Sequence, residues 1–341
     1  MTATVGLLLA QLGTPESPST GDVRRYLREF LSDPRVIDLP GPARWLFVNF
    51  VIARFRAPRS AQAYRAIWGP NGSPLRVHTD ALGAELAKAL GEGFRVEVGM
   101  RYGAPSIEHA LERLVDSGAR RIVVLALYPQ HAESSRGSAL AAVEAWQAKR
   151  AEAPELRILP PFFREEGFVN AVAAAARPVL AELRPDHVLM SYHSLPERHV
   201  LKADPSRERC LGRPDCCVQP GATDSCYRAQ CFATSRAVAL ALGLAPERVS
   251  TSFQSRLGRA RWIGPSTDDL LISLAGRGVR RLVVLCPSFV ADCLETLEEI
   301  GIRGRARWNE LHGQAFALAP CVNATAPFVD FVAAEVRKAA G

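Results

Sequence analysis

The chain has 341 residues, 48% of them hydrophobic and 23% charged, a composition typical of a well-packed globular protein and not of a disordered one. No run reaches the roughly 18 apolar residues that a membrane span requires, and the start, MTATVGLLLAQLGTP, lacks the basic region and the cleavage site of a signal peptide. We therefore expect a cytoplasmic protein. Its net charge of +7 favours an anionic partner, but no nucleic-acid-binding motif is present, so we expect no nucleic acid.

Short runs rich in β-branched residues alternate along the chain with longer Ala-, Leu- and Glu-rich helical patterns. The predicted strands are residues 5–10, 94–100, 120–129, 187–194, 248–255 and 280–289. Apolar strands separated by helices indicate parallel sheets covered on both faces. A chain of this length favours two domains.

Residues 41–64 form the most unusual apolar segment. Large apolar side chains alternate there with arginines, namely Trp45, Phe47, Phe50, Val51 and Phe55 with Arg44, Arg54, Arg56 and Arg59. Two interpretations stay open. The segment is either a core helix with an arginine-rich exposed edge, or an exposed amphipathic surface for a bilayer or a large flat apolar ligand.

Two stretches of the chain look like copies of each other. SGARRIVVLALYP at 117–129 and RGVRRLVVLCPSF at 277–289 share a basic pair followed by a buried strand, and each follows a helical pattern that begins with Pro-Ser, at 105–116 and 265–276. A short match can arise by chance, but the agreement of the preceding segments favours a duplication. We expect two similar α/β halves facing a cleft, with ligands outside the carboxyl ends of the strands.

Two predicted strand ends carry polar groups. His193 ends an apolar strand, where a histidine is either structural or part of a site. After the strand that ends at Pro287, a helix is predicted from near Ala291. This helix would place Asp292, Glu295 and Glu299 on one stripe of its surface. That stripe is either an acidic face in water, or a set of carboxylates in a cleft that attracts cations and accepts protons.

Nine short motifs then give a family resemblance. They are QLGTP (11–15), EFLSDPRVIDLP (29–40), GSPL (72–75), MRYGAPS (100–106), LYPQ (127–130), SYHSLP (191–196), SFQSR (252–256), WIGP (262–265) and DCLETLEE (292–299). In this ordered set the chain resembles the ferrochelatases, the terminal enzymes of haem synthesis. The resemblance implies two Rossmann-like domains with parallel sheets flanked by helices, a porphyrin cleft between them, and insertion of Fe²⁺ with loss of two protons. It favours protoporphyrin IX as substrate, with coproporphyrin III second.

The resemblance also assigns roles to single positions. His193 and Glu295 match the family's active-site histidine and glutamate, implied ligands of the substrate Fe²⁺ and acceptors of the pyrrole protons, while Glu299 and Asp292 lie on the implied acidic path. The implied porphyrin-binding residues are Leu12, Arg101, Tyr102, Gln254, Ser255 and Trp262. Cys293 stands where some members have His, and we infer no loss of activity from it.

An insertion interrupts the family pattern between Pro205 and Tyr227, which usually almost adjoin. It carries four cysteines, Cys210, Cys216, Cys217 and Cys226. The adjacent pair disfavours structural zinc, a reducing cytosol disfavours disulfides, and unrelated thiols would make the clustering a coincidence. A [2Fe–2S] cluster held by four thiolates fits best, and some ferrochelatases carry one in an internal insertion of this kind.

These inferences set the expected organisation. We expect an amino-terminal half at 1–165 with segment 41–64 as a hydrophobic lip, a carboxyl-terminal half at 166–315 with the insertion at 206–226, and a terminal helix within 316–341 packing back on the first half. Because porphyrin and haem dissolve poorly in water, we expect peripheral contact with the inner membrane, and with protoporphyrinogen oxidase. The rivals are a cobalt chelatase and a non-catalytic porphyrin or haem carrier with an iron–sulfur sensor.

Overall fold

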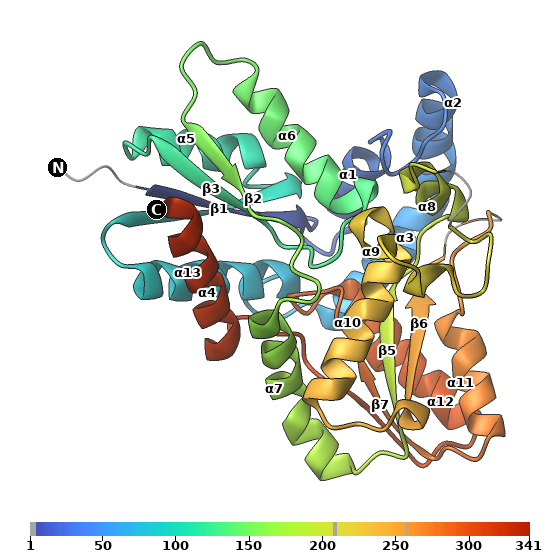
Figure 1. The fold of residues 1–341 in the computed structure, drawn as a ribbon. Helices are drawn as coiled ribbons and strands as arrows, with labels where there is room; N and C mark the ends of the chain where they lie inside the picture. The colour runs from blue at the N-terminus through green and yellow to red at the C-terminus, as the bar shows by residue number, and fades with distance from the viewer. Residues whose placement is uncertain (1–4, 207–209, 257, 259) are drawn as a thin grey trace. The chain divides into compact units, whose positions relative to one another are not determined.

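The chain folds into two compact units. The computed structural model describes residues 5–206, 210–256, 258 and 260–341, so three positions of the Cys-rich insertion, 207–209, lie outside the described residues. Unit 1 comprises Met1–Tyr128, Ala132–Pro160 and Phe328–Gly341, and unit 2 comprises Pro129–His131 and Pro161–Pro327. The chain therefore builds most of unit 1, then unit 2, and returns to unit 1 for its last helix (Figure 1).

Unit 1 is built on a parallel sheet with the strand order β2-β1-β3-β4. Its strands are β1 (Val5–Gly13), β2 (Phe94–Tyr102), β3 (Arg121–Ala126) and β4 (Glu155–Ile158). Successive residues of a strand face opposite sides of the sheet. Leu8 accordingly packs with Ile107 and Trp146 on one side, while Leu9 faces the helix that carries Gly83. Burial on both faces explains why the central strand is almost entirely apolar.

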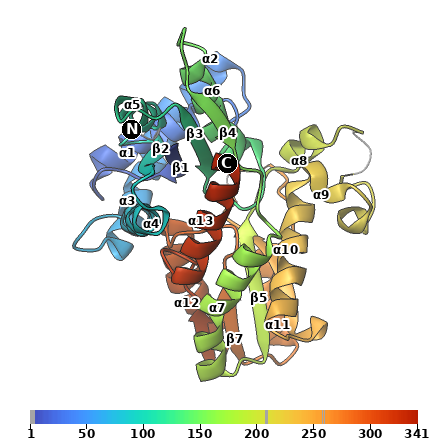
Figure 2. The same cartoon turned by 60° about the vertical axis from the view of Figure 1, so that its left-hand side comes forward.

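The helices of unit 1 cover this sheet. They are α1 (Thr20–Leu31), α4 (Pro74–Leu90), α5 (Ile107–Asp116), η2 (Glu133–Gly137), α6 (Ser138–Gln147) and α13 (Ala326–Ala340). Ser106 caps α5 by accepting a hydrogen bond from the His109 N–H at 3.1 Å. Helix α13 lies beside α4 (Figures 1 and 2), where Arg337 donates to the Ala89 carbonyl.

Segment 41–64 forms consecutive helical pieces, α2 (Gly41–Leu46), the π-helix η1 (Phe47–Arg56) and the first turns of α3 (Ala57–Ile67). One side of it is buried, as Val48 and Ile52 show at 0% and 4% exposure. The aromatic side is open: the exposed fractions of Trp45, Phe50 and Phe55 are 58%, 60% and 67%. These three aromatic side chains are therefore not core residues of the structure.

Unit 2 repeats the plan of unit 1. Its parallel sheet has the order β6-β5-β7-β8, with β5 (His187–His193), β6 (Val249–Gln254), β7 (Arg281–Leu285) and β8 (Ala315–Leu318). In both units the strand that comes second along the chain lies outside the first, and the third and fourth follow on the other side. The predicted α/β class with two similar parallel sheets flanked by helices is confirmed.

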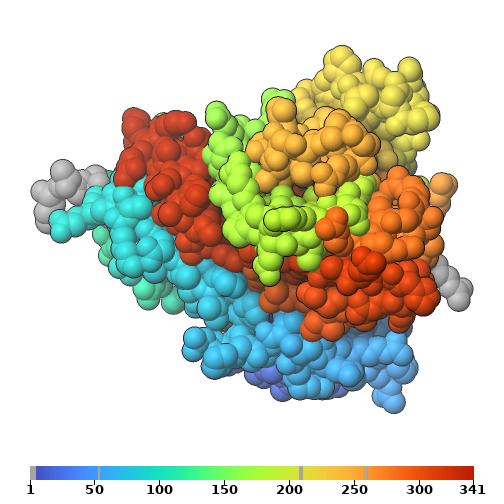
Figure 3. Space-filling model, turned by 90° about the horizontal axis from the view of Figure 1, so that it is seen from below, coloured from blue at the N-terminus to red at the C-terminus, as the bar shows by residue number. Residues whose placement is uncertain are grey.

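The helices of unit 2 follow the same alternation. They are α7 (Glu166–Leu183), α8 (Glu197–Ala203), η3 (Cys216–Val218), α9 (Ala222–Ser225), α10 (Tyr227–Ala241), η4 (Pro246–Arg248), α11 (Thr267–Gly276), the π-helix η5 (Leu294–Gly304) and α12 (Arg305–Glu310). The Cys-rich insertion, yellow in Figure 3, lies on the surface of this unit beside α10. Within the described residues, no helix has both the length and the apolar character that a bilayer crossing demands.

Candidate functional site

Polar side chains of unit 2 meet at the carboxyl ends of its central strands. His193 is the last residue of β5 and pairs in register with Gln254, the last residue of β6. The π-helix η5, which carries Glu295 and Glu299, follows the next strand, β7. The structure thus places the predicted histidine, and the helix that carries two of the three predicted carboxylates, after neighbouring strands at the sheet edge where α/β folds bind ligands.

The imidazole of His193 is held in one tautomer. Its Nδ1 lies 2.5 Å from the carbonyl oxygen of Ser194, and a carbonyl can only accept a hydrogen bond, so Nδ1 carries the proton. Nε2 of the neutral ring then holds the lone pair, the form that binds a metal or accepts a proton. The backbone of His193 is fixed as well, because its N–H donates to Ser288 Oγ at 3.3 Å and its carbonyl accepts from Tyr227 at 2.9 Å.

Gln254 connects the strand ends to η5. Its Nε2 donates to the Glu295 carbonyl at 2.8 Å and to Glu299 Oε2 at 3.5 Å, and its Oε1 accepts from Ser191 Oγ at 2.6 Å. The side chain is 3% exposed. In this structure the amide therefore holds β5, β6 and η5 together and offers little surface to a ligand.

Ser255 directs two donors at Glu299. Its N–H donates to Glu299 Oε1 at 2.9 Å, and its hydroxyl donates to Oε2 of the same carboxylate. The backbone of Ser255 has a φ of 66°, which is unusual for a residue other than glycine and costs roughly 1–2 kcal/mol. Such strain is typical of positions that aim a group at a functional site.

The predicted three-carboxylate stripe is wrong in its geometry. The helix begins at Leu294 and not near Ala291, and it is a π-helix, so the 3.6-residue periodicity does not apply. Its start is set by Thr296, whose Oγ1 accepts from the Cys293 N–H at 2.9 Å in a capping box. Asp292 precedes this helix.

Asp292 is instead part of the loop that precedes the helix. It is 6% exposed, and its carboxylate accepts hydrogen bonds from Asn323 Nδ2 at 2.8 Å and Thr296 Oγ1 at 3.3 Å. Glu298, the remaining carboxylate of this motif, forms an ion pair with Arg303 at 3.0 Å.

The thiol of Cys293 lies near Glu295. Burial of this thiol and the negative charge of Glu295 raise the pKa of Cys293 well above its usual value.

Trp262 lies in a segment pinned to the loop after His193. The two segments form a bridge between Pro196 and Trp262, and the Ile263 N–H donates to the Leu195 carbonyl at 2.9 Å. The Ser194 hydroxyl donates to the Ile263 carbonyl at 3.0 Å. The WIGP and SYHSLP motifs are therefore neighbours in space, although about seventy positions separate them along the chain.

Arg101 and Tyr102 end β2 of unit 1 and belong to a buried network. Arg101 and the Tyr102 hydroxyl both donate to Asp33 Oδ2, at 2.7 Å and 3.0 Å, and Ser138 Oγ donates to the same oxygen at 2.5 Å. Burial alone would raise the pKa of Asp33, but the hydrogen bonds from Ser138 and Tyr102 and the charge of Arg101 lower it. Tyr102 is 1% exposed, and Leu12 in β1 is half-buried.

Sequence reasoning missed Asp33 and Ser138 as members of this network. Asp33 lies in the EFLSDPRVIDLP motif, which supported the family resemblance without assigning a role to this residue. Ser138 lies in none of the nine motifs. An acidic residue buried beside an arginine becomes recognisable only when the fold places the two together.

The four cysteines of the insertion come together. All are buried, with exposed fractions of 4–7%, and the sulfurs of Cys216 and Cys217 are 3.9 Å apart. Burial raises the pKa of Cys210, whose thiol also interacts with that of Cys226. A hydrogen bond with Cys226 and burial raise the pKa of Cys217. Among the described residues, no group of three or more Cys, His, Asp or Glu side chains has the arrangement of a bound metal.

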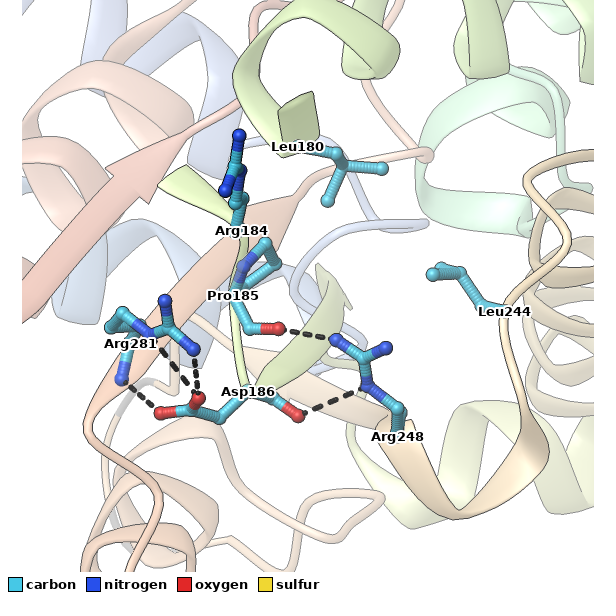
Figure 4. Close-up of a pocket in the computed structure, with 7 residues that line it drawn as sticks. All are labelled: Leu180, Arg184, Pro185, Asp186, Leu244, Arg248 and Arg281. Atoms are coloured by element: carbon cyan, nitrogen blue, oxygen red, sulfur yellow. Dashed lines mark hydrogen bonds and ion pairs between the residues drawn. The ribbon is translucent and has the colours of Figure 1, made fainter. Parts of the chain in front are cut away.

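A cavity of about 610 Å³ opens elsewhere in unit 2 (Figure 4). It lies next to Asp186, which precedes β5, whereas His193 ends that strand, roughly 20 Å away at 3.3 Å per residue. Asp186 accepts a hydrogen bond from Arg281 at 2.7 Å, which is the main reason why its pKa falls to about 2. This cavity is thus not part of the candidate site.

Comparisons with known proteins agree with the motifs. The family model described as ferrochelatase matches residues 4–340. A ferrochelatase of Coxiella burnetii is 45% identical over 334 residues, 98% of this chain and 93% of the relative. One from Azotobacter vinelandii is 48% identical over 319 residues, 93% of this chain and 94% of the relative.

Solved structures agree in fold. The sirohydrochlorin chelatase SirB from Bacillus subtilis subspecies spizizenii, in complex with cobalt, covers 99% of this chain and 95% of its own, with a TM-score of 0.55 at 12% identity. That identity shows a shared fold only. The family match and the curated relatives go further: the chain belongs to the ferrochelatase family, and the predicted activity, insertion of iron into a porphyrin for haem synthesis, is confirmed.

Proposed function

We propose that His193 and Glu295 form the metal-insertion centre of this enzyme and that protoporphyrin IX is its porphyrin substrate. The observation that carries the proposal is the hydrogen bond from Nδ1 of His193 to the Ser194 carbonyl. It leaves the Nε2 lone pair for Fe²⁺ or a pyrrole proton, at a strand end where Gln254 also holds the carboxylate-bearing helix η5.

The chemistry of the reaction explains why such a pair is required. A planar porphyrin keeps its nitrogens in the ring plane, so a cation reaches them only when the ring is distorted, and binding energy from the rest of the macrocycle supplies that distortion. Fe²⁺ sheds its water on the way, and imidazole with a carboxylate suits it as intermediate ligands. Two pyrrole protons must leave, and in this proposal His193 and Glu295 accept them.

Other predicted residues take supporting places in this proposal. Glu299 and Asp292 form the acidic path, Glu299 held by Ser255 and Asp292 held by its loop. Trp262 would contribute to the porphyrin pocket beside the loop after His193. The pocket residues of unit 1, Leu12, Arg101 and Tyr102, remain part of the proposal, with the side chain of Tyr102 supporting Arg101 and not touching the ring.

We further propose that Cys210, Cys216, Cys217 and Cys226 hold a [2Fe–2S] cluster. Four buried thiols gathered in a short insertion provide the donor chemistry of such a cluster. Since thiols must lose their protons to bind metal, cluster loading would release protons from this group. The exposed aromatic side chains of segment 41–64 likewise support peripheral attachment to an anionic membrane surface.

The central test measures metal insertion directly. Purified protein is incubated anaerobically with Fe²⁺, or with Zn²⁺, and protoporphyrin IX or coproporphyrin III, and the loss of free-porphyrin fluorescence is followed. We expect faster turnover of protoporphyrin IX and none in a folded His193→Ala variant. Normal turnover in that variant would remove His193 from the mechanism, and a preference for coproporphyrin III would change the substrate.

A further inference from the structure

Helix α10 begins directly after Cys226, the last cysteine of the insertion. Its first two residues reach two other places in unit 2. The Tyr227 hydroxyl donates to the carbonyl oxygen of His193 at 2.9 Å. Arg228 donates through Nε and Nη2 to the carbonyl oxygen of Gly264, each at 3.1 Å. Gly264 belongs to the WIGP motif that carries Trp262.

The same guanidinium also contacts the thiol group. Nη1 of Arg228 lies 3.1 Å from the sulfur of Cys217, so one planar cation joins a cysteine of the insertion to the Trp262 segment. The guanidinium lies 4.9 Å from the ring centre of Phe232, one turn further along α10, which restricts its rotamer. Because this cation is held on three sides, a shift of Cys217 would be passed on to Gly264.

Tyr227 is equally constrained. It is 7% exposed, and the residue before it, Cys226, accepts the first hydrogen bond of α10 from the Gln230 N–H at 3.0 Å. A movement of Cys226 therefore moves the start of α10 and, with it, the hydroxyl that supports the His193 carbonyl.

We propose that Tyr227 and Arg228 are positioning residues that couple the four-cysteine group to the porphyrin site. Arg228 fixes the Trp262 segment and so contributes to porphyrin affinity. Tyr227 fixes the backbone of His193 and so contributes to the rate of metal insertion. The inference rests on the proposed role of His193 and Trp262, and it gives the insertion a structural effect on a reaction that transfers no electrons.

The test separates porphyrin binding from turnover in the full-length protein. Protoporphyrin IX affinity is measured by quenching of protein fluorescence, and kcat and KM are measured with Zn²⁺. Arg228→Ala should raise the porphyrin Kd and KM about 10-fold with kcat changed less than twofold, the effect of losing about 1.4 kcal/mol. Tyr227→Phe should lower kcat about fivefold with the porphyrin KM unchanged.

A matched control lies on the same helix. Arg236 is exposed on α10, so Arg236→Ala makes the same change of charge and should leave both constants as they are. Arg228→Lys keeps the cation but cannot form the two-pronged contact with Gly264. The Arg228→Lys variant should recover only part of the porphyrin affinity. It replaces Arg228→Ala in the test if the alanine variant does not fold.

A double-mutant cycle tests the coupling itself. If Cys217 acts through Arg228, Cys217→Ala should weaken porphyrin binding, and the double variant should bind no more weakly than Arg228→Ala. Additive losses in the double variant, or unchanged porphyrin affinity in both Arg228 variants, would overturn the proposal. An active His193→Ala variant would instead refute the proposed metal-insertion centre. A higher porphyrin Kd in Arg228→Ala would still support the role of Arg228 in porphyrin binding.

Discussion

Replacement of Gln254 tests whether its amide holds β5, β6 and η5 together at the proposed metal-insertion centre. Gln254→Leu puts an apolar side chain of similar size in place of the amide and removes the hydrogen bonds to the Glu295 carbonyl at 2.8 Å and from Ser191 at 2.6 Å. At about 1 kcal/mol for each buried hydrogen bond, the loss is about 2 kcal/mol. If this free energy is lost wholly from the transition state, kcat falls about 30-fold. If it is lost from the stability of the fold, Tm falls by about 4–8 °C.

Gln254→Glu is the sharper version of the same change. The shape and the acceptor for Ser191 are kept, but a second carboxylate replaces the amide 3.5 Å from Glu299 Oε2. Two carboxylates this close raise each other's affinity for a proton. The protonated form restores a donor, so the activity of this variant relative to the native enzyme should rise as the pH falls from about 8 to about 6.

Both variants are measured by initial rates of Zn²⁺ insertion into protoporphyrin IX and by thermal unfolding. We expect the leucine variant to lose rate or Tm by the amounts above, and the glutamate variant to lose more at high pH. Native rate and Tm in Gln254→Leu would refute the view that this amide positions η5. A rate ratio for Gln254→Glu that does not change with pH would refute the close approach to Glu299.

Three further outcomes are expected. Glu295→Gln should lower the insertion rate by about 10²–10⁴-fold. Glu298→Gln should change the rate little, because the Glu298 carboxylate already forms an ion pair on the same helix. Equal effects of the two substitutions in rate assays would contradict the role of Glu295. The purified protein should be reddish-brown with about two irons and two labile sulfides per chain. The Cys210→Ser variant should lose the colour, whereas the Cys231→Ser variant should keep it. A colourless, active protein with stoichiometric zinc would show that the four cysteines bind zinc and not an iron–sulfur cluster. Binding to anionic liposomes should weaken with added salt and in Trp45→Ser; co-sedimentation indifferent to both would exclude segment 41–64 as the membrane contact.

The sequence predicted both interior strands and one edge strand of each sheet, and it missed β4 and β8, which form the other edges. The central strands are continuous apolar runs because both faces are covered, as Leu7 to Leu9 of β1 show at 0% exposure. Strand β4 is short, reads ELRI, and is mostly exposed. Strand β4 is held in place by backbone pairing with β3, which is distant in the sequence. A local pattern of side chains does not predict such pairing.

The candidate site was predicted in its residue types better than in its geometry. His193 and Glu299 lie at the predicted sheet edge, but the stripe that included Asp292 assumed an α-helix. Helical periodicity read from a sequence presumes i to i+4 hydrogen bonds, and a π-helix changes the spacing without changing the composition. The support of Glu299 by Ser255 depends on a left-handed backbone at a serine, which composition does not predict.

The order in which the chain visits its two units has a consequence for synthesis. Unit 2 takes nearly all its residues from one continuous stretch, Pro161–Pro327, whereas unit 1 is completed only by Phe328–Gly341. In α13 the side chains of Phe328, Val332 and Val336 are 0–1% exposed, and at about 1.5–3 kcal/mol each they contribute on the order of the whole stability of a domain. On the ribosome, unit 2 can therefore fold as soon as it emerges, while unit 1 must wait for α13. A chain released before α13 is made would carry a folded unit 2 beside a unit 1 that lacks the helix completing its core.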